Sequence, residues 1–388
     1  MNCTIIGGAG FIGTKTALQL VARGHTVRIL DALEPQIHGL DVLASEMLAS
    51  VAGKVPVTVG DVRDPAAVRQ ALDAAEVIYY FAAGTGTGQS MYQVRKYTEI
   101  NVLGAAVLGE ELALRKNQIR RVVISSSRAV YGEGAYTCAR HGRIFPRSRE
   151  PRALEAGQFT PLCPNCSGPL TETASLESDP VQPSSIYGIT KLAQEQIILN
   201  LCESLGIAAV ALRYQNVFGP GQSLKNPYTG ILSIFSQQLL QDKPINVFED
   251  GRPTRDFIYI DDIAEFNCRA GEKELSGSHI CNVGTGERQT LLDVVNALAK
   301  AYDRKPDYRI SGQFRLGDIR HAAADTGHLF RVLGDHTFVS FADGINRFSE
   351  WVKRQDIELE SNTRYARSLK EMASIGLLRG GSGEPGKS

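Results

Sequence analysis

The sequence has no surplus of charge of either sign. Its 388 residues include 42 Lys and Arg against 42 Asp and Glu, so the formal net charge is zero. Proteins that bind nucleic acids or anionic membranes usually carry a basic excess. We therefore expect neither kind of partner.

Long apolar runs are also missing. No stretch reaches the roughly 18 consecutive apolar residues that a membrane-spanning helix needs. Met1 leads almost directly into the apolar run Cys3–Ile6, which leaves no room for a signal peptide. The remaining composition, 43% hydrophobic and 22% charged, is ordinary for a globular protein. These features predict a cytoplasmic location.

Cysteine is present in an odd number, seven, and an odd number in a large chain without a leader argues against a disulfide framework. Three of the seven occur close together in the irregular segment 133–183. We expect the other four to be small buried side chains; they are Cys3, Cys202, Cys268 and Cys281.

The first half of the chain alternates short apolar runs with helical patterns, such as 11–23, 100–116 and 186–204. Near-continuous apolar runs are typical of parallel strands that are buried on both faces. Their alternation with helices predicts an α/β fold with a doubly wound parallel sheet. The expected strands are 3–6, 26–30, 55–59, 77–81, 122–124 and 208–212.

A glycine-rich loop follows the first of these strands. Gly7, Gly10 and Gly13 are spaced three residues apart, and Phe11 and Ile12 begin the next helix. Such a loop lets the backbone turn tightly and approach a pyrophosphate at the helix N-terminus, as in Rossmann dinucleotide sites.

Two acidic positions lie at later strand ends. Asp31 comes 18 residues after Gly13, where a carboxylate can bind both adenosine ribose hydroxyls and repel a 2′-phosphate. Asp31 therefore favours NAD over NADP, although it could be an ordinary solvated strand-end residue. Asp61 and Val62 follow the third strand and could hold the adenine or simply form a turn.

Tyr187 and Lys191 are separated by four positions on a predicted helix, so both side chains lie on one face. A nearby ammonium favours the phenolate and makes tyrosine a usable base. Ser127 ends the fifth strand, where its hydroxyl would face the nicotinamide side of the crevice. The spacing of Tyr187 and Lys191 alone is uninformative, but the combination predicts hydride chemistry.

These motifs together resemble the extended short-chain dehydrogenase/reductases, in the family's order and over about residues 1 to 345. The glycine loop, S-S-S-x-x-V-Y-G at 125–132, Y-G-x-T-K at 187–191 and R-Y-Q-N-V-F-G-P at 213–220 carry the resemblance. It implies that Ser127 bonds the reacting sugar oxygen, Tyr187 is the base, and Lys191 supports it and binds the ribose. NAD is the implied cofactor.

The resemblance implies further contacts. It assigns Ala82 and Asn101 to the cofactor site and Asn216 to the diphosphate-sugar. Arg255 would clamp a phosphate, since a guanidinium suits bidentate phosphate binding. The remaining implied substrate residues are Phe248 at the nucleobase, with Arg315 and Asp318 completing the nucleotide site; a surface ion pair is the alternative for these charged groups.

The family includes several reactions. Its 4,6-dehydratases typically carry an Asp-Glu pair directly after the catalytic hydroxyl, whereas this chain has Arg128 and Ala129. Neither side chain can exchange a proton at neutral pH, which disfavours dehydration. The sequence therefore favours 4-epimerisation of a sugar nucleotide, with dehydration, decarboxylation or ketone reduction as alternatives, and non-catalytic dinucleotide binding as a more distant one.

One group within the family is more similar than the rest. The segments 84–92 and 226–231, the Cys-bearing insertion and G-D-I-R-H at 317–321 resemble the dTDP-L-rhamnose 4-epimerase group. This resemblance implies interconversion of dTDP-L-rhamnose and dTDP-6-deoxy-L-talose, hence a dTDP-sugar substrate. Thr87 and its small neighbours would line the sugar site.

Two cysteine-bearing knuckles lie in the insertion. Cys138 and His141 form C-x₂-H, and Cys163 and Cys166 form C-x₂-C, separated by 21 residues. This pattern predicts a structural, tetrahedral Zn²⁺ site with a Cys₃His shell. An incidental cluster of thiols is the alternative.

The expected organisation has three parts. Residues 1–215 form the NAD-binding Rossmann domain, which carries the insertion 133–183, and residues 216–350 form a sugar-nucleotide lobe. Residues 351–388 form a C-terminal helix and a disordered tail. The resemblance also suggests a homodimer through the paired helices 91–116 and 186–204.

Overall fold

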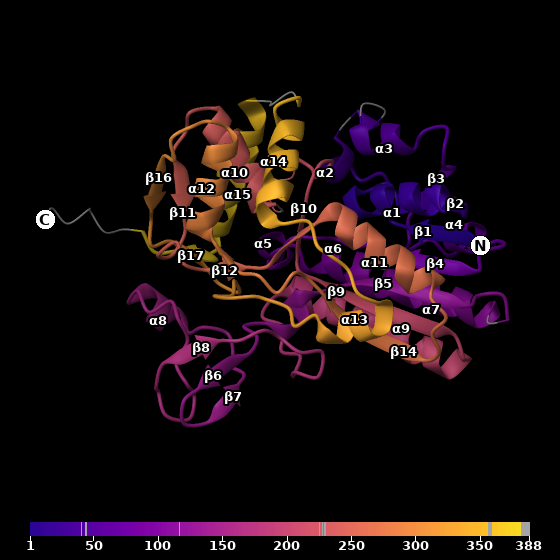
Figure 1. Cartoon of the computed structure of the whole chain (residues 1–388), viewed down its shortest axis with the longest axis horizontal. Coiled ribbons are helices and arrows are strands. Elements are labelled where there is room, and N and C mark those ends of the chain that lie inside the picture. Colours follow the sequence, from indigo (N-terminus) through magenta and orange to yellow (C-terminus); the bar gives the residue numbers. More distant parts are fainter. Residues whose placement is uncertain are drawn as a thin grey trace, which may run out of the picture.

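Seven parallel strands form the central sheet, in the order β14-β9-β5-β4-β1-β2-β3 (Figure 1). The computed structural model describes residues 1–39, 41–42, 45–115, 117–224, 226, 228, 230–355 and 359–381. The predicted doubly wound Rossmann fold is confirmed. Its strands are β1 (Asn2–Ile6), β2 (Thr26–Asp31), β3 (Val57–Val59), β4 (Val77–Tyr80), β5 (Arg121–Ser127), β9 (Ala208–Tyr214) and β14 (Ser278–Val283).

The seventh strand, β14, was not predicted. It pairs in parallel with β9, so that the backbone groups on that side of β9 are bonded. Its mixed sequence, with Ser278, His279 and Asn282, lacks the continuous apolar character of the others. The central sheet is therefore not confined to residues 1–215, because the chain returns to it at β14.

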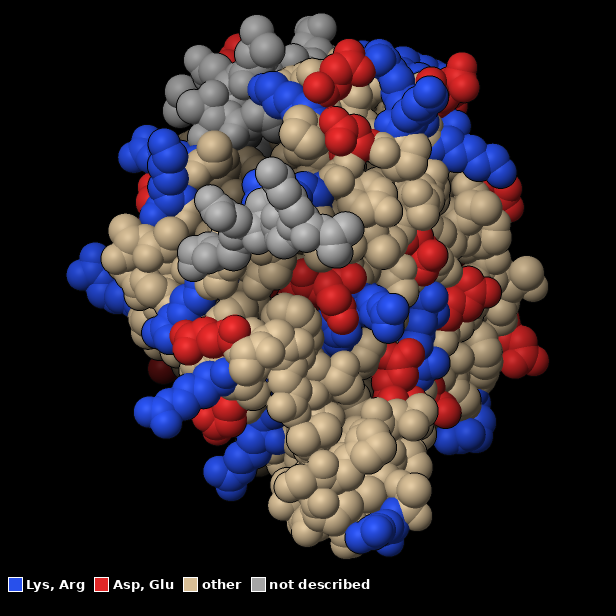
Figure 2. Space-filling model, turned by 90° about the vertical axis from the view of Figure 1, so that its left-hand side faces the viewer, with Lys and Arg blue, Asp and Glu red and all other residues tan. Residues whose placement is uncertain are grey.

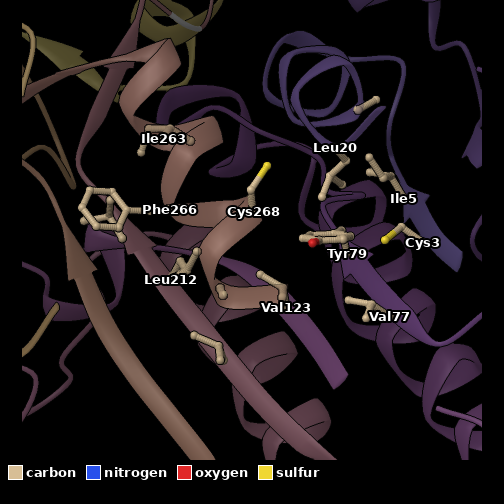
Figure 3. Close-up of a cluster of buried hydrophobic side chains, with 14 of the residues drawn as sticks. Cys3, Ile5, Leu20, Val77, Tyr79, Val123, Leu212, Ile263, Phe266 and Cys268 are labelled. Atoms are coloured by element: carbon tan, nitrogen blue, oxygen red, sulfur yellow. The ribbon is translucent and has the colours of Figure 1, made fainter. Parts of the chain in front are cut away.

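Helices cover both faces of the sheet. On one face, Leu20 and Phe266 belong with Cys3 and Tyr79 to one continuous core. Figure 3 shows Leu20, Cys3 and Tyr79 grouped on its right side, with Phe266 at the other end of the cluster. Cys3, Cys202, Cys268 and Cys281 are buried free thiols, as expected. The covering helices are α1 (Phe11–Ala22), α3 (Glu46–Val51), α11 (Ile260–Glu272) and α13 (Gly327–Leu333) on this face, and α4 (Pro65–Ala71), α7 (Gly104–Leu114) and α9 (Ile186–Leu205) on the other.

The helix expected at 100–116 is preceded by further helical turns. It follows α6 (Val94–Thr98) and a π-helical turn, η2 (Glu99–Leu103), before α7 begins. Lys116, at its predicted end, lies outside the described residues, as do 382–388 of the predicted tail.

A smaller unit packs around a second core beside the sheet, on the left of Figure 1. Phe218, Phe235, Ile245 and Phe348 are among its buried side chains. Its elements and the short strands and helices around them are β10 (Asn216–Phe218), α10 (Ile231–Leu240), β11 (Ile245–Val247), β12 (Thr254–Arg255), β13 (Phe257–Tyr259), β15 (Gln289–Thr290), α12 (Leu291–Ala301), β16 (Tyr308–Ile310), β17 (Phe314–Arg315), α14 (Phe341–Val352), α15 (Leu359–Ser374) and β18 (Leu378–Arg379).

The insertion forms its own small antiparallel sheet, seen at the bottom of Figure 1. Its elements are β6 (Tyr136–Cys138), β7 (Gly142–Ile144), α8 (Pro151–Glu155) and β8 (Leu170–Glu172). Only Tyr136, Cys138, Cys163 and Leu170 form its buried apolar cluster among the described residues. In Figure 2 the lowest part of the molecule shows mostly uncharged side chains. So small a core contributes little to stability by itself.

No helix in the described ranges combines the length and the apolar character that crossing a bilayer requires.

Candidate active site

A cavity of about 540 Å³ lies over the carboxyl ends of the central strands. The strand order reverses between β1 and β4, and open α/β sheets bind ligands at such a switch point. Most of the predicted cofactor and catalytic residues line it, together with two of the predicted substrate residues. They are Gly7, Gly10, Phe11, Ile12, Gly13, Asp31, Asp61, Val62, Ala82, Thr87, Ser127, Tyr187, Lys191 and Asn216.

The glycine loop has the geometry that a pyrophosphate needs. Gly7 has φ +80°, and a Cβ there would lie 2.4 Å from the Ala82 nitrogen. A Cβ on Gly13 would lie 2.5 Å from the Gly8 Cα. By contrast, a Cβ on Gly10 would find no protein atom nearer than 4.0 Å, and no side chain caps the α1 N-terminus at this residue. The free helix N–H groups therefore face open space in the cavity.

Asp31 is fixed at the end of β2. Its carboxylate accepts hydrogen bonds from the Ala9 N–H at 2.9 Å and the Leu33 N–H at 2.8 Å. These bonds tie the carboxylate to the glycine loop beside the cavity, where it could also accept from ribose hydroxyls. Asp61 instead pairs with Arg63 at 2.5 Å, and the hydrogen bonds from Arg63 lower the Asp61 pKa.

Asn101 lies behind the cavity wall. It is fully buried, and it is not one of the lining residues. Its side-chain oxygen accepts from the Gly84 N–H at 2.7 Å, and its amide nitrogen donates to Thr190 Oγ1 at 2.9 Å. This amide joins the Gly84 loop to the helix that carries Lys191, which gives it a positioning role, and its contact with the cofactor stays a prediction.

Ser127, Tyr187 and Lys191 meet at one end of the cavity. Tyr187 lies in the first turn of α9, where its N–H donates to Ser90 Oγ at 3.0 Å. Burial raises the Tyr187 pKa, whereas a hydrogen bond with Ser127 and the charge of Arg128 lower it. Two neighbours therefore act on this phenol in the direction that favours its ionised form.

A buried ionic network lies next to the catalytic residues. Glu195, one turn after Lys191, accepts from Ser126 Oγ at 2.5 Å and from Arg213 Nη2 at 2.6 Å. Arg213 also donates to the Tyr131 hydroxyl at 2.7 Å. Buried charges of this kind are stable only when fully paired. The network holds β5, α9 and β9 in register around the catalytic groups.

Lys191 is a buried cation whose ammonium donates to the Gln194 side chain. Burial lowers its pKa to about 7, and the nearby Glu195 carboxylate only partly offsets this effect. The folded state therefore binds this proton less tightly than the unfolded chain, whose lysine titrates near ~10.4. The resulting destabilisation is fully present below about pH 7 and disappears as the pH rises toward the unfolded value.

We accordingly expect Lys191→Met to stabilise the NAD-free protein by on the order of 1–3 kcal/mol at pH 6 while abolishing turnover. The gain should shrink as the pH is raised from about 6 to 9. Urea unfolding at several pH values measures it. A variant that is less stable than the wild type at pH 6 would contradict the conclusion that the lowered pKa of Lys191 destabilises the folded protein.

The other predicted substrate residues form a second cluster next to the cavity but not in its wall. The Arg255 guanidinium donates to the Thr254, Ile319 and Arg320 carbonyl oxygens. The Arg315 guanidinium lies 4.8 Å from the centre of the Phe248 ring and 3.9 Å from the Asp318 carboxylate. Their contacts with substrate stay predictions.

Some buried polar atoms along the cavity have no partner among the described residues. They include Asn216 Oδ1, Gln215 Oε1, Gln222 Oε1 and Asn226 Nδ2. A buried polar atom without a hydrogen bond is costly. These atoms fit a cavity that is filled by a polar ligand. Pro227 and Thr229, from the segment that resembles the rhamnose epimerases, lie outside the described residues.

The four predicted metal ligands converge in the insertion. Their ligand atoms all lie within 4.8 Å of one another. Cys138 Sγ lies 3.5 Å from His141 Nδ1 and 3.8 Å from Cys166 Sγ, and Cys163 Sγ lies 3.6 Å from the same nitrogen. Tetrahedral bonds of about 2.3 Å to sulfur and about 2.0–2.1 Å to nitrogen give ligand separations of roughly 3.5–3.8 Å.

The thiols of this cluster do not all favour the ionised form. The hydrogen bond from the Gly168 N–H lowers the pKa of Cys166, but burial and the neighbouring thiols outweigh it, so this pKa is raised. A hydrogen bond from the Arg140 backbone N–H, followed by one with the His141 side chain, lowers the Cys138 pKa to about 6. A thiolate is the form that binds metal. The donor set and the spacing both fit Zn²⁺.

Sequence reasoning missed three residues at the catalytic end. Gln194 bonds Lys191 and the Ala82 carbonyl, and the Tyr97 ring meets the Tyr187 ring edge-on at 6.5 Å. Neither residue gives a local signal, because only the fold brings it to the site. Arg128 was considered only as a group that cannot transfer protons, although its place after Ser127 could have indicated it.

The family model that describes the NAD dependent epimerase/dehydratase family matches residues 3–151 and 160–284. The chain belongs to this family. Among curated relatives, the dTDP-L-rhamnose 4-epimerase of Burkholderia thailandensis is 34% identical over 353 residues, covering 90% of this chain and 94% of that protein. The predicted family is thus confirmed, and the chain is an enzyme, an isomerase of the epimerase type.

Solved structures agree with this placement. The UDP-glucose 4-epimerase of Thermus thermophilus in complex with NAD has a TM-score of 0.71 and 26% identity, covering 92% of this chain and 100% of that chain. MoeE5 in complex with UDP-glucose and NAD has a TM-score of 0.72 and 25% identity, covering 91% and 99%. The relatives therefore include enzymes of both dTDP- and UDP-sugars.

Proposed function

We propose that this chain is an NAD-dependent nucleotide-sugar 4-epimerase acting on dTDP-L-rhamnose. The observation that carries the proposal is the meeting of Ser127, Tyr187 and Lys191 in one cavity that also contains the glycine loop and Asp31. The absence of an acid–base pair directly after Ser127 favours epimerisation over dehydration.

Each catalytic side chain has a distinct task. Tyr187 takes the proton of the sugar 4-hydroxyl, Ser127 bonds the same oxygen, and Lys191 stabilises the phenolate by its charge. Bound NAD supplies a hydride acceptor and donor at C4, which makes the step reversible. After the 4-keto sugar turns over, Tyr187 returns the proton to the oxygen, so the reaction consumes no second substrate.

One comparison supports the dTDP-L-rhamnose assignment over a UDP-sugar, and the cavity lining is compatible with that assignment. The relative of that name shares 34% identity over 90% of this chain. Gly84, Thr85 and Gly86, which are small, line the cavity beside Thr87. Such a lining accommodates both a 6-deoxy sugar and an intermediate that must turn over.

The test is incubation of the purified protein with dTDP-L-rhamnose and, separately, with UDP-glucose, followed by NMR of the product. We expect dTDP-6-deoxy-L-talose from the first and no C4 change in the second. Turnover of UDP-glucose alone would replace the substrate assignment. Loss of water from UDP-glucose, which carries the 6-hydroxyl that a 4,6-dehydratase removes, would replace the reaction assignment.

We also propose that Cys138, His141, Cys163 and Cys166 hold a structural Zn²⁺. All four coordination positions are taken by protein, which leaves no position for substrate and argues against a catalytic metal. The metal content of the purified protein tests this proposal. One zinc per chain supports it, and substoichiometric zinc with all four ligands intact contradicts it.

We further propose that the protein forms a homodimer through the helices at 91–116 and 186–204. Four of the nine large apolar side chains that are exposed among the described residues lie on these helices, namely Val94, Leu103, Leu114 and Ile189. Exposed apolar side chains on these two helices are what a helix-mediated contact with a second copy would cover. Sedimentation analysis tests whether Leu103→Glu converts a dimer to a monomer.

A further inference from the structure

Arg128 occupies an unusual position in the cavity. It directly follows Ser127 and begins the 3₁₀ turn η3 (Arg128–Tyr131). The turn is fixed, since Ser127 Oγ accepts from the Ala129 N–H at 3.2 Å. A Cβ on Gly188 would lie 2.6 Å from the Ala129 carbonyl oxygen, so the first turn of α9 packs directly on η3. Arg128 lines the cavity beside Tyr187.

The Arg128 guanidinium has no hydrogen bond or salt bridge within the described part of the chain. By contrast, the buried guanidinium groups of Arg149, Arg213 and Arg320 each pair with a carboxylate. Burial lowers the Arg128 pKa to about 10, so the group still carries its charge at neutral pH. The guanidinium donors of Arg128 are therefore free to bind a ligand in the cavity.

The charged neighbours of Arg128 indicate which part of a bound sugar nucleotide would lie near it. The groups that act on Arg128 are Arg255, Asp318, Tyr187 and Glu133. Arg128 is thus near both the catalytic phenol and Arg255, the predicted phosphate clamp. In a sugar nucleotide the hexose spans the distance between C4 and the diphosphate, so a cation near both groups would be within reach of the hexose.

We propose that Arg128 is a catalytic and specificity residue that donates hydrogen bonds to oxygens of the hexose and stabilises the Tyr187 phenolate by its charge. This inference rests on the proposed function. Arg128 takes no proton itself; the proton still passes between the sugar 4-hydroxyl and Tyr187. Its contribution to the rate is electrostatic, because a cation close to the phenol favours the charged form.

The pH dependence follows from the groups that face Tyr187. They are Ser127 from β5, Arg128 from η3, Tyr97 from α6 and Lys191 one turn along α9. Removal of the Arg128 charge raises the pKa of the phenol. The acidic limb of the activity profile should therefore move to higher pH.

The experiment compares Arg128→Met and Arg128→Lys with the wild type, all loaded with NAD. For Arg128→Met we expect affinity for dTDP-L-rhamnose to fall about tenfold or more, as for one lost charge-assisted hydrogen bond. Affinity for dTDP, which has no hexose, should change less than about twofold. The acidic limb of kcat/KM should move up by about one pH unit. In Arg128→Lys the acidic limb of kcat/KM should return to its wild-type position, because the positive charge is kept. The affinity for dTDP-L-rhamnose should stay low, because an ammonium lacks the forked donors of a guanidinium.

The controls separate the two proposals. Arg309→Met, in exposed β16, should match the wild type in every measurement. Turnover by the wild type tests the proposed function alone, and if it acts on UDP-glucose instead, the same comparison is made with UDP-glucose and UDP. Equal weakening of dTDP and dTDP-L-rhamnose would assign Arg128 to the diphosphate and overturn the inference, as would an Arg128→Met variant that behaves like Arg309→Met. If the wild type turns over neither sugar nucleotide, both proposals fail.

Discussion

Replacing Tyr187 with phenylalanine should reduce kcat by a factor on the order of 10³ and leave NAD binding nearly unchanged. The phenol hydroxyl is the group that receives the proton of the sugar hydroxyl in the proposed reaction. Ser127 is bonded to this hydroxyl and has no basic group of its own to replace it. The substitution keeps the ring, so its edge-on contact with Tyr97 and the start of α9 are preserved.

NAD binding provides the internal control for this variant. The residues that would hold the pyrophosphate and the adenosine ribose, at the glycine loop and Asp31, belong to β1, α1 and β2, and Lys191, the ribose-binding residue on α9, is left in place. We expect the variant to retain bound NAD in the same proportion as the wild type, with an unchanged melting temperature. Tyr308→Phe, on exposed β16, is the matched control and should remain fully active.

Activity of Tyr187→Phe within about tenfold of the wild type would show that another group takes the proton. The same result would remove the main argument for the electrostatic part of the Arg128 inference. Its hydrogen bonds to the hexose would still be tested by the comparison of dTDP-L-rhamnose with dTDP. The two experiments therefore probe the phenol and the guanidinium separately.

The parallel sheet could be predicted because its strands leave a strong local signal. The runs at 77–81 and 122–124 are apolar throughout, since both faces of β4 and β5 are covered by helices. β14 gave no such signal: its first residue is exposed and the next two are half-buried. Its place beside β9 follows from the whole fold and not from its own sequence.

The same distinction applies to the site. The motifs indicated Ser127, Tyr187 and Lys191 because each has a fixed place relative to a strand end or a helix. Asn101 shows the limit of that reasoning, since its position in the sequence does not reveal that its amide bonds Gly84 and Thr190. Side-chain direction depends on packing and on the π turn η2, which no residue pattern in the sequence predicts.

The C-terminal residues show another contact that local patterns cannot give. β18 pairs with β17, the strand that carries Arg315. Tyr365, on α15, is half-buried near Arg315 and Asp318, and desolvation raises its pKa. The predicted C-terminal helix therefore packs over the predicted nucleotide site, although it lies more than 100 residues after Arg255 in the sequence.

Loss of the proposed zinc should weaken substrate binding without weakening NAD binding. The insertion packs against the segment 317–325 through several bonds. The Glu133 carboxylate accepts from the Arg320 N–H at 2.8 Å, and Arg149 donates to the Asp318 carbonyl oxygen at 2.9 Å. Farther along, the Ser175 N–H donates to the Ala323 carbonyl oxygen at 2.9 Å. The insertion thus buttresses the segment that holds Asp318.

Because the apolar cluster of the insertion is so small, its order should depend on the metal. For Cys163→Ser we expect less than stoichiometric zinc, a KM for the sugar nucleotide that rises by about tenfold or more, and a kcat that changes much less. The bound NAD should be unchanged, since the insertion contributes no residue to the cavity wall around the glycine loop. Steady-state kinetics, metal analysis and limited proteolysis within 139–169 measure these effects.

Asn165→Ser is the matched control, because Asn165 is exposed between Cys163 and Cys166 and is not a ligand. It should retain one zinc per chain and the wild-type KM. Two results would contradict the proposal that the insertion supports the segment 317–325. A zinc-free Cys163→Ser protein with an unchanged KM would show that the segment 317–325 holds its own conformation. A fall in kcat at unchanged KM would place the metal in the chemical step, which its closed ligand shell argues against.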